Sequence, residues 1–162
     1  MTERTHRGNG EETMNALRPI YILEDSDDDY ELLQRLLVSA NVNAPLERAV
    51  SGTAAIQRLI GVVLEAAPSL VFTDLTMPDG DGFEFLSWAR VQPAFQDTLI
   101  VVLSSTRRCA DIDRAYSLGA HFFLSKFPSA AMLAALCASA EKRELALQAR
   151  IAAFRKDHEV AV

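Results

Sequence analysis

Five side chains that could bind a cation or a phosphoryl group stand at the ends of four apolar, strand-like runs. Glu24 and Asp25 follow the run PIYIL, and Asp74 follows SLVFT. Ser104 ends the run LIVVLS, and Lys126 follows HFFLS. If these runs are parallel strands of one sheet, their carboxyl ends meet at one edge, so the five side chains are predicted to face a common crevice.

The residue types predict the chemistry of that crevice. Three carboxylates repel one another unless a cation lies among them, and a few carboxylates with water are how proteins hold Mg²⁺. A lysine and a hydroxyl then complement the equatorial oxygens of a transferring phosphoryl group. Asp74 is the best candidate acceptor because it ends the predicted central strand and precedes an accessible loop with Pro78, Gly80 and Gly82. Carboxylates do form aspartyl phosphates.

Strand-like and helix-like segments alternate from Pro19 onward. Ser51 is a plausible N-cap, and Gly119 a plausible C-terminal residue, of two of the helices. The second predicted helix is expected to carry Ile56, Leu59, Ile60 and Val63 on one face. Five strands alternating with helices, several of them apolar on both faces, predict an α/β fold with a parallel sheet covered on both sides. Right-handed crossovers favour the doubly wound, flavodoxin-like strand order 2-1-3-4-5.

The 162 residues are predicted to form three parts. Residues 1–18 are polar and lack periodicity, as is typical of a flexible arm. Residues 19–137 carry the alternating elements and are expected to form the domain. Residues 138–162 are expected to be a helical extension of the last helix, followed by a tail.

The predicted last helix runs from about Ser129 to Lys156, nearly double the length that such a domain needs. Its distal part carries an apolar stripe of Leu147, Ile151 and Phe154. This stripe is expected to fold back, to pair with a second copy or to dock on a partner, and a symmetric dimer is the preferred interpretation.

Composition excludes several classes of function. A formal net charge of −6 argues against a dedicated nucleic-acid binder, which would carry a basic face. No apolar run approaches the roughly 18 residues of a membrane span, and the polar start has no signal-peptide core, so we expect a cytoplasmic protein without membrane contact. Cys109 and Cys137 lack the spacing of a metal site and are expected to be reduced thiols.

In combination, four segments resemble the receiver (response regulator) family, the CheY-like superfamily, over about Pro19 to Cys137. These segments are YILEDSDDDYELL, SLVFTDLTMPDGDGFEFL, LIVVLSS and GAHFFLSK. Within this family, the chain is most similar to the short regulators paired with phytochrome-type kinases. The resemblance implies that Mg²⁺ is held by Glu24, Asp25, Asp74 and the backbone carbonyl of Thr76, and that Asp74 accepts the phosphoryl group. It also implies that Ser104 and Phe123 are the switch residues and that Lys126 contacts the phosphate.

The resemblance also implies a phosphoryl donor, either a sensor histidine kinase or a histidine phosphotransfer protein. Output is expected through protein contact, since no DNA-reading or enzymatic domain fits into the remaining residues. Two alternatives stay open: a receiver-like interaction module that takes no phosphate, and a haloacid-dehalogenase-type phosphatase. Enzymes of the latter class resemble one another in carrying a second aspartate two residues after the nucleophile. This chain has Thr76 at that position instead.

One departure from the family concerns the loop that carries Lys126. The family usually has Lys-Pro with a cis peptide bond, whereas Phe127 stands between Lys126 and Pro128 here. A cis bond before a residue other than proline costs about 3–4 kcal/mol. The sequence therefore leaves open whether the Lys126–Phe127 bond is trans or is held cis.

Overall fold

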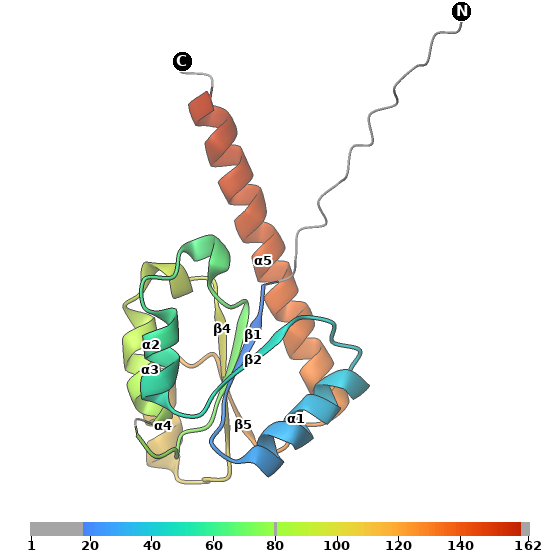
Figure 1. The fold of residues 1–162 in the computed structure, drawn as a ribbon, viewed down its shortest axis with the longest axis vertical. Helices are drawn as coiled ribbons and strands as arrows, with labels where there is room; N and C mark the ends of the chain where they lie inside the picture. The colour runs from blue at the N-terminus through green and yellow to red at the C-terminus, as the bar shows by residue number, and fades with distance from the viewer. Residues whose placement is uncertain (1–17, 80, 160–162) are drawn as a thin grey trace, which may run out of the picture.

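The computed structural model describes residues 18–79 and 81–159, which form a sheet with helices on both faces (Figure 1). The strands are β1 Ile20–Leu23, β2 Leu46–Ala49, β3 Leu70–Thr73, β4 Leu99–Ser104 and β5 Phe122–Ser125. The helices are α1 Asp27–Ser39, α2 Gly52–Leu59, α3 Gly82–Arg90, α4 Cys109–Ser117 and α5 Ala130–Glu159, with 3-10 turns η1 Leu64–Ala66 and η2 Pro93–Phe95.

All strand pairs are parallel, and the order is β2-β1-β3-β4-β5, which confirms the predicted doubly wound fold. The register places Leu23 of β1 beside Thr73 of β3, and Thr73 beside Val102 of β4. One step further along, the amide of Asp74 donates to the carbonyl of Leu23 at 3.0 Å. The residues that follow β1 and β3 therefore leave the sheet at the same level.

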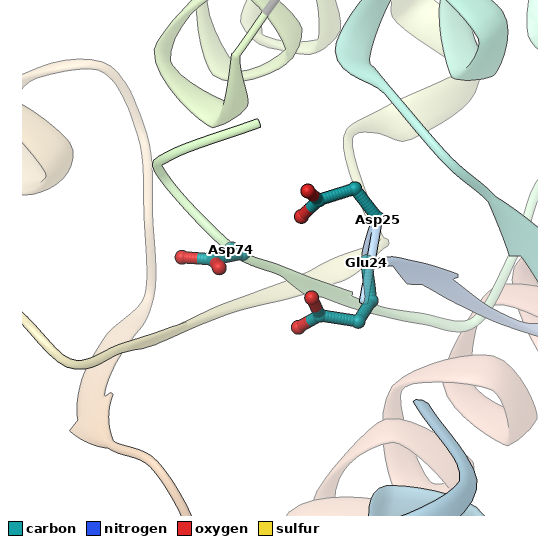
Figure 2. A group of neighbouring side chains, drawn as sticks. All are labelled: Glu24, Asp25 and Asp74. Atoms are coloured by element: carbon teal, nitrogen blue, oxygen red, sulfur yellow. The ribbon is translucent and has the colours of Figure 1, made fainter. Parts of the chain in front are cut away.

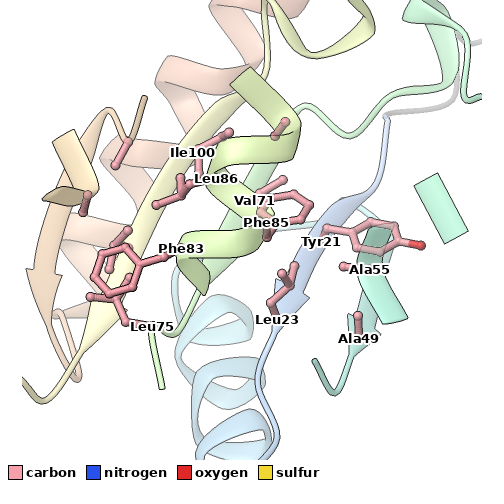
Figure 3. Close-up of a cluster of buried hydrophobic side chains, with 14 of the residues drawn as sticks. Tyr21, Leu23, Ala49, Ala55, Val71, Leu75, Phe83, Phe85, Leu86 and Ile100 are labelled. Atoms are coloured by element: carbon pink, nitrogen blue, oxygen red, sulfur yellow. The ribbon is translucent and has the colours of Figure 1, made fainter. Parts of the chain in front are cut away.

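The two faces of the sheet support separate apolar clusters. Helices α1 and α5 cover one face, and α2, α3 and α4 cover the other (Figure 1). Successive side chains of a strand point to opposite faces. Ile20 and Ile22 of β1 accordingly pack with α1 and α5, whereas Tyr21 and Leu23 pack with α2 and α3, in the cluster of Figure 3. Burial on both faces explains why β1, β3 and β4 are mostly apolar along their whole length.

Local residue signals mark where α2 begins and where α4 ends. The hydroxyl of Ser51 accepts from the amide of Ala54 at 3.0 Å, which confirms the predicted N-cap of α2. Gly119 follows α4 with φ of 101°, as expected of a residue that closes a helix. The prediction for the end of α2 is wrong, because the helix stops at Leu59 and leaves Ile60 and Val63 mostly exposed.

The predicted C-terminal extension of α5 is present and is held against the domain. Glu144 forms an ion pair with Arg18, with Oε1 3.3 Å from Nε, and both side chains are almost fully buried. Arg143 donates to the carbonyl of Asp97 at 3.2 Å, and Arg150 lies 3.7 Å from the Asp97 carboxylate. Leu147 is buried, so at this residue the apolar stripe packs against its own chain.

Most of the predicted arm, residues 1–17, lies outside the described residues. Arg18 is described: besides its ion pair it donates to the carbonyl of Leu64 at 3.1 Å. Among the described helices, none has a stretch long and apolar enough to cross a membrane. Cys109 and Cys137 are free thiols, and burial, together with the charge of Glu141, raises the pKa of Cys137 to about 11.

Replacing Glu144 by alanine should destabilise the fold, because the buried Arg18 guanidinium loses its counter-charge. Removal of one partner of a buried ion pair costs about 3 kcal/mol or more of unfolding free energy, which urea denaturation would measure. Glu141→Ala, at an exposed position one turn earlier on α5, is the matched control and should change little. Equal losses for the two variants would contradict a structural role for the Arg18–Glu144 pair.

Candidate functional site

Three carboxylates meet at the carboxyl edge of the sheet, as the sequence predicts. Glu24 and Asp25 follow β1, Asp74 follows β3, and their side chains converge on one space (Figure 2). One carboxylate oxygen from each lies within 4.8 Å of those of the other two. Glu24 is only 4% exposed, Asp74 is half-buried and Asp25 is exposed. The space is thus closed on the side of the sheet and open to solvent at Asp25.

Lys126, from the loop after β5, is in direct contact with this group. Its Nζ donates to Oε2 of Glu24 at 2.6 Å and to Oδ2 of Asp74 at 2.8 Å. A third bond, also of 2.8 Å, goes to Oδ2 of Asp29 in the first turn of α1. An ammonium has three N–H groups, so these three bonds use all of them. Only 7% of the Lys126 side chain is exposed.

Asp29 is the site residue that the sequence analysis missed. The only signal was its membership of the acidic run from Glu24 to Asp29. Such a run is also typical of an exposed helix start, where the helix dipole favours acids. The sequence does not show which of Asp27, Asp28 and Asp29 turns inward, because that depends on where α1 begins relative to the sheet.

Burial and charge act in opposite directions on the two innermost ionisable groups. Burial alone would lower the pKa of Lys126, but the hydrogen bonds to Asp29, Asp74 and Glu24 outweigh it and raise this pKa above its ordinary value. Burial raises the pKa of Glu24, although the bonds from Lys126 and from the Ser26 amide oppose that shift. The ammonium therefore stays charged at neutral pH.

The donor set fits a hard divalent cation. Mg²⁺ prefers oxygen ligands and is commonly held by one or two carboxylates with water. Glu24, Asp25 and Asp74 offer such oxygens close enough together to share one ion. With Asp29 included, the single ammonium of Lys126 leaves three carboxylate charges uncompensated, which favours a further cation.

Backbone amides set the orientation of the Asp74 carboxylate. Its Oδ1 accepts from the amide of Leu75 at 2.6 Å and from that of Thr76 at 3.3 Å. Its Oδ2 faces Lys126, so the two oxygens have different partners. Thr76 is exposed at this turn, and the role of its carbonyl as a metal ligand stays a prediction.

Arg48 of β2 holds the turn that carries Glu24 and Asp25. Its guanidinium donates to the carbonyl of Glu24 at 2.9 Å, to that of Asp25 at 3.0 Å and to the Asp27 carboxylate at 2.7 Å. The guanidinium carbon also lies 4.6 Å from the centre of the Tyr30 ring, within the range of a cation–π contact. One side chain thus links β2, the β1–α1 turn and α1.

The predicted switch residues lie on the neighbouring strands: Ser104 is the last residue of β4, and Phe123 lies within β5. Ser104 is only 2% exposed; its hydroxyl accepts from the Thr106 amide at 3.3 Å, and its carbonyl accepts from the Lys126 amide at 3.2 Å. Of the two adjacent phenylalanines, Phe123 packs against the core, whereas Phe122 is 43% exposed.

The peptide bond between Lys126 and Phe127, which the sequence left open, is cis. Lys126 contacts Glu24, Asp29 and Asp74 although Phe127 stands between it and Pro128.

Comparisons with known proteins agree with this geometry. A model of the response regulator receiver domain matches residues 20–137. Response regulator Rcp1 of Synechocystis sp. (strain ATCC 27184 / PCC 6803 / Kazusa) is 28% identical over 115 residues, which cover 69% of this chain and 78% of Rcp1. A protein-glutamate methylesterase/protein-glutamine glutaminase of Anaeromyxobacter dehalogenans (strain 2CP-C) is 36% identical over 108 residues, 66% of this chain but only 29% of that protein.

Solved structures show the same fold. The Mn²⁺-bound form of Rcp1 superposes with a TM-score of 0.63 at 25% identity, covering 74% of this chain and 91% of that one. The bacteriophytochrome response regulator AtBRR superposes with a TM-score of 0.65 at 27% identity, covering 77% and 93%.

Replacing Gly82 by alanine should disturb the Asp74 turn. A Cβ built at Gly82 lies 2.0 Å from the carbonyl oxygen of Asp74, so the backbone has to shift. We expect a loss of about 1–3 kcal/mol of unfolding free energy, as for other overpacked sites, with altered amide NMR shifts at Leu75 and Thr76. Ser87→Ala, at an exposed position of the same helix, is the control. Unchanged stability and shifts in Gly82→Ala would contradict the close approach.

Proposed function

Because the chain belongs to the response regulator receiver domain family, we propose that it accepts a phosphoryl group on Asp74, with Mg²⁺ bound beside it, and signals through protein contacts. The donor is a sensor histidine kinase or a histidine phosphotransfer protein. The observation that carries the proposal is the Lys126 ammonium, 2.8 Å from Oδ2 of Asp74, next to three carboxylates that can share one cation.

In the proposed reaction, a carboxylate oxygen of Asp74 attacks the phosphorus of a phosphohistidine. A P–O bond forms and the P–N bond breaks, with its electron pair going to the imidazole of the donor. Lys126 donates a hydrogen bond to a phosphoryl oxygen as charge gathers there. Glu24, Asp25, Asp74 and the Thr76 carbonyl would hold Mg²⁺, which would supply further positive charge beside the phosphoryl oxygens.

The phosphorylated state is proposed to act through the two switch residues. A phosphoryl oxygen draws the Ser104 hydroxyl inward, and Phe123 moves into the space that is vacated. This change biases the face formed by α4, β5 and α5 between two states, and the affinity for a partner follows the bias.

Two features favour a phosphoacceptor over the alternatives. Thr76 stands two residues after Asp74, where a phosphatase of the haloacid-dehalogenase class needs an aspartate to activate water. An acyl phosphate should therefore persist long enough to signal. A module that takes no phosphate was suggested only by the unusual Lys126–Phe127–Pro128 order, and Lys126 contacts Asp74 despite that order.

The proposed partners follow from the proposed transfer. Similarity to the bacteriophytochrome response regulator AtBRR supports a phytochrome-type kinase as the donor. We propose a cytoplasmic location, because the chain would receive its phosphoryl group there from a histidine kinase. We also propose a homodimer through the distal part of α5, where Ile151 remains only partly buried and Phe154 is 64% exposed.

Phosphorylation can be tested by intact mass and Phos-tag mobility after incubation with acetyl phosphate and Mg²⁺. We expect a gain of one phosphoryl group in the wild type, lost with EDTA and absent in Asp74→Asn. Asp28→Asn, an exposed acid in the first turn of α1, is the control and should still be modified. Failure with both acetyl phosphate and a competent phosphohistidine protein would contradict the phosphoacceptor proposal.

The dimer can be tested by size-exclusion light scattering over a range of concentrations. We expect twice the 17.8 kDa of one chain, and a shift toward one chain in Ile151→Glu, because a charge would be buried in the interface. Ala149→Glu places the same charge on the opposite side of the helix and should leave the assembly intact. A wild type that stays at the mass of one chain would refute this interface.

A further inference from the structure

The three carboxylates that hold Lys126 differ in what the proposed reaction asks of them. Glu24 and Asp74 are both proposed to bind the cation, and Asp74 also receives the phosphoryl group. Asp29 has neither role, and its Oδ2 lies 2.8 Å from the ammonium. When Glu24 and Asp74 turn to the cation and the phosphoryl group, Asp29 is the one of the three whose bond to Lys126 need not change.

We propose that Asp29 is a positioning residue for phosphoryl transfer, which keeps the Lys126 ammonium beside Asp74 while the other two carboxylates engage the cation and the phosphoryl group. This inference rests on the proposed function. Asp29 acts through Lys126 and does not itself touch the phosphoryl group.

The element that carries Asp29 gives it a fixed position. Asp29 is the third residue of α1, and its amide donates to the Ser26 hydroxyl, the N-cap of that helix, at 3.3 Å. Leu33 and Leu37, further along the same helix, are buried in the core cluster beneath α1. The carboxylate is therefore attached to a rigid part of the fold rather than to a loop.

Lys126 needs such an anchor more than a shorter side chain would. It lies on the loop after β5, and a lysine side chain carries about 2 kcal/mol of rotamer entropy. A fixed charge-assisted hydrogen bond offsets part of the cost of holding the ammonium at one place. Positioning of this kind contributes to the rate because the group is already in place when charge develops on the phosphoryl oxygens.

The neighbouring acids allow positioning to be separated from a general effect of negative charge. Asp27 is bound by Arg48, 2.7 Å away, and points to β2. Asp28 is exposed and belongs to the same helical turn as Asp29. Removing Asp28 changes the charge near the site by the same amount without touching the anchor of Lys126.

The kinetic test compares wild type, Asp29→Ala, Asp29→Asn and Asp28→Ala in phosphorylation by acetyl phosphate over a series of Mg²⁺ concentrations. Asp29→Ala should be about tenfold slower at saturating Mg²⁺, the effect of about 1.4 kcal/mol on a barrier, with its half-saturating Mg²⁺ concentration within about twofold of wild type. Asp29→Asn should recover part of the rate, because its amide oxygen still accepts from the ammonium. Asp28→Ala should match the wild type.

A second readout needs neither metal nor phosphate. Lysine-selective NMR can follow the exchange of the Lys126 ammonium protons with water in the metal-free protein. Exchange should be slow in wild type and Asp28→Ala and clearly faster in Asp29→Ala. Thermal melting of each variant shows that it is folded, and Asp29→Asn replaces Asp29→Ala if the alanine variant is not.

Equal behaviour of Asp29→Ala and Asp28→Ala, in both the rate and the proton exchange, would overturn the positioning role. An effect of Asp29→Ala only on the half-saturating Mg²⁺ concentration would also overturn it, because Asp29 would then act on the cation. If the wild type itself takes no phosphoryl group, the proposed function fails, and the NMR comparison alone decides whether Asp29 holds Lys126.

Discussion

The contact of one ammonium with three carboxylates is the interaction on which the rest of the site depends. Lys126 comes from the loop after β5, and its partners Glu24, Asp29 and Asp74 come from the end of β1, the start of α1 and the end of β3. Carboxylates this close together repel one another unless positive charge compensates them. The parallel sheet brings the four elements to one edge, and the Lys126 ammonium offsets part of the repulsion among their acidic side chains.

Backbone constraints determine how precisely these charges are placed. Arg48 binds the carbonyls of Glu24 and Asp25, so the turn that carries both acids is tied to β2. Gly82 lies so close to the Asp74 carbonyl that a side chain larger than hydrogen does not fit. Such preorganisation reduces the rearrangement that binding of a cation or a phosphoryl group would require. The geometry of the site therefore depends on Arg48 and Gly82 as well as on the carboxylates themselves.

Helix α5 connects the core of the domain to its C-terminal extension as one continuous element. Leu133 and Leu136 of its first half pack in the same core cluster as the strand residues of one sheet face. Glu144, further along, pairs with Arg18 at the entry to β1, and Arg143 and Arg150 bind Asp97 just before β4. The extension is thus anchored at the edge of the sheet opposite to the carboxylates, since both contacts lie where strands begin.

The sequence by itself determined the fold and most of the site's members. Alternating apolar runs predicted the sheet order, and the polar residue after each run predicted that Glu24, Asp74 and Lys126 meet, because parallel strands end at one edge. One member of the site was decided only by the tertiary structure. Asp29 could not be told from its acidic neighbours, since the rotation of α1 about its axis is set by packing. Its orientation depends on the bond to Lys126 and on the packing of Leu33 and Leu37, which are contacts between segments distant in sequence that local residue patterns do not contain. Hydrophobic spacing alone missed the end of α2 at Leu59, although Gly61, with φ of 76°, is a local signal for the end of a helix. The sequence also left open the Lys126–Phe127 bond, which is cis.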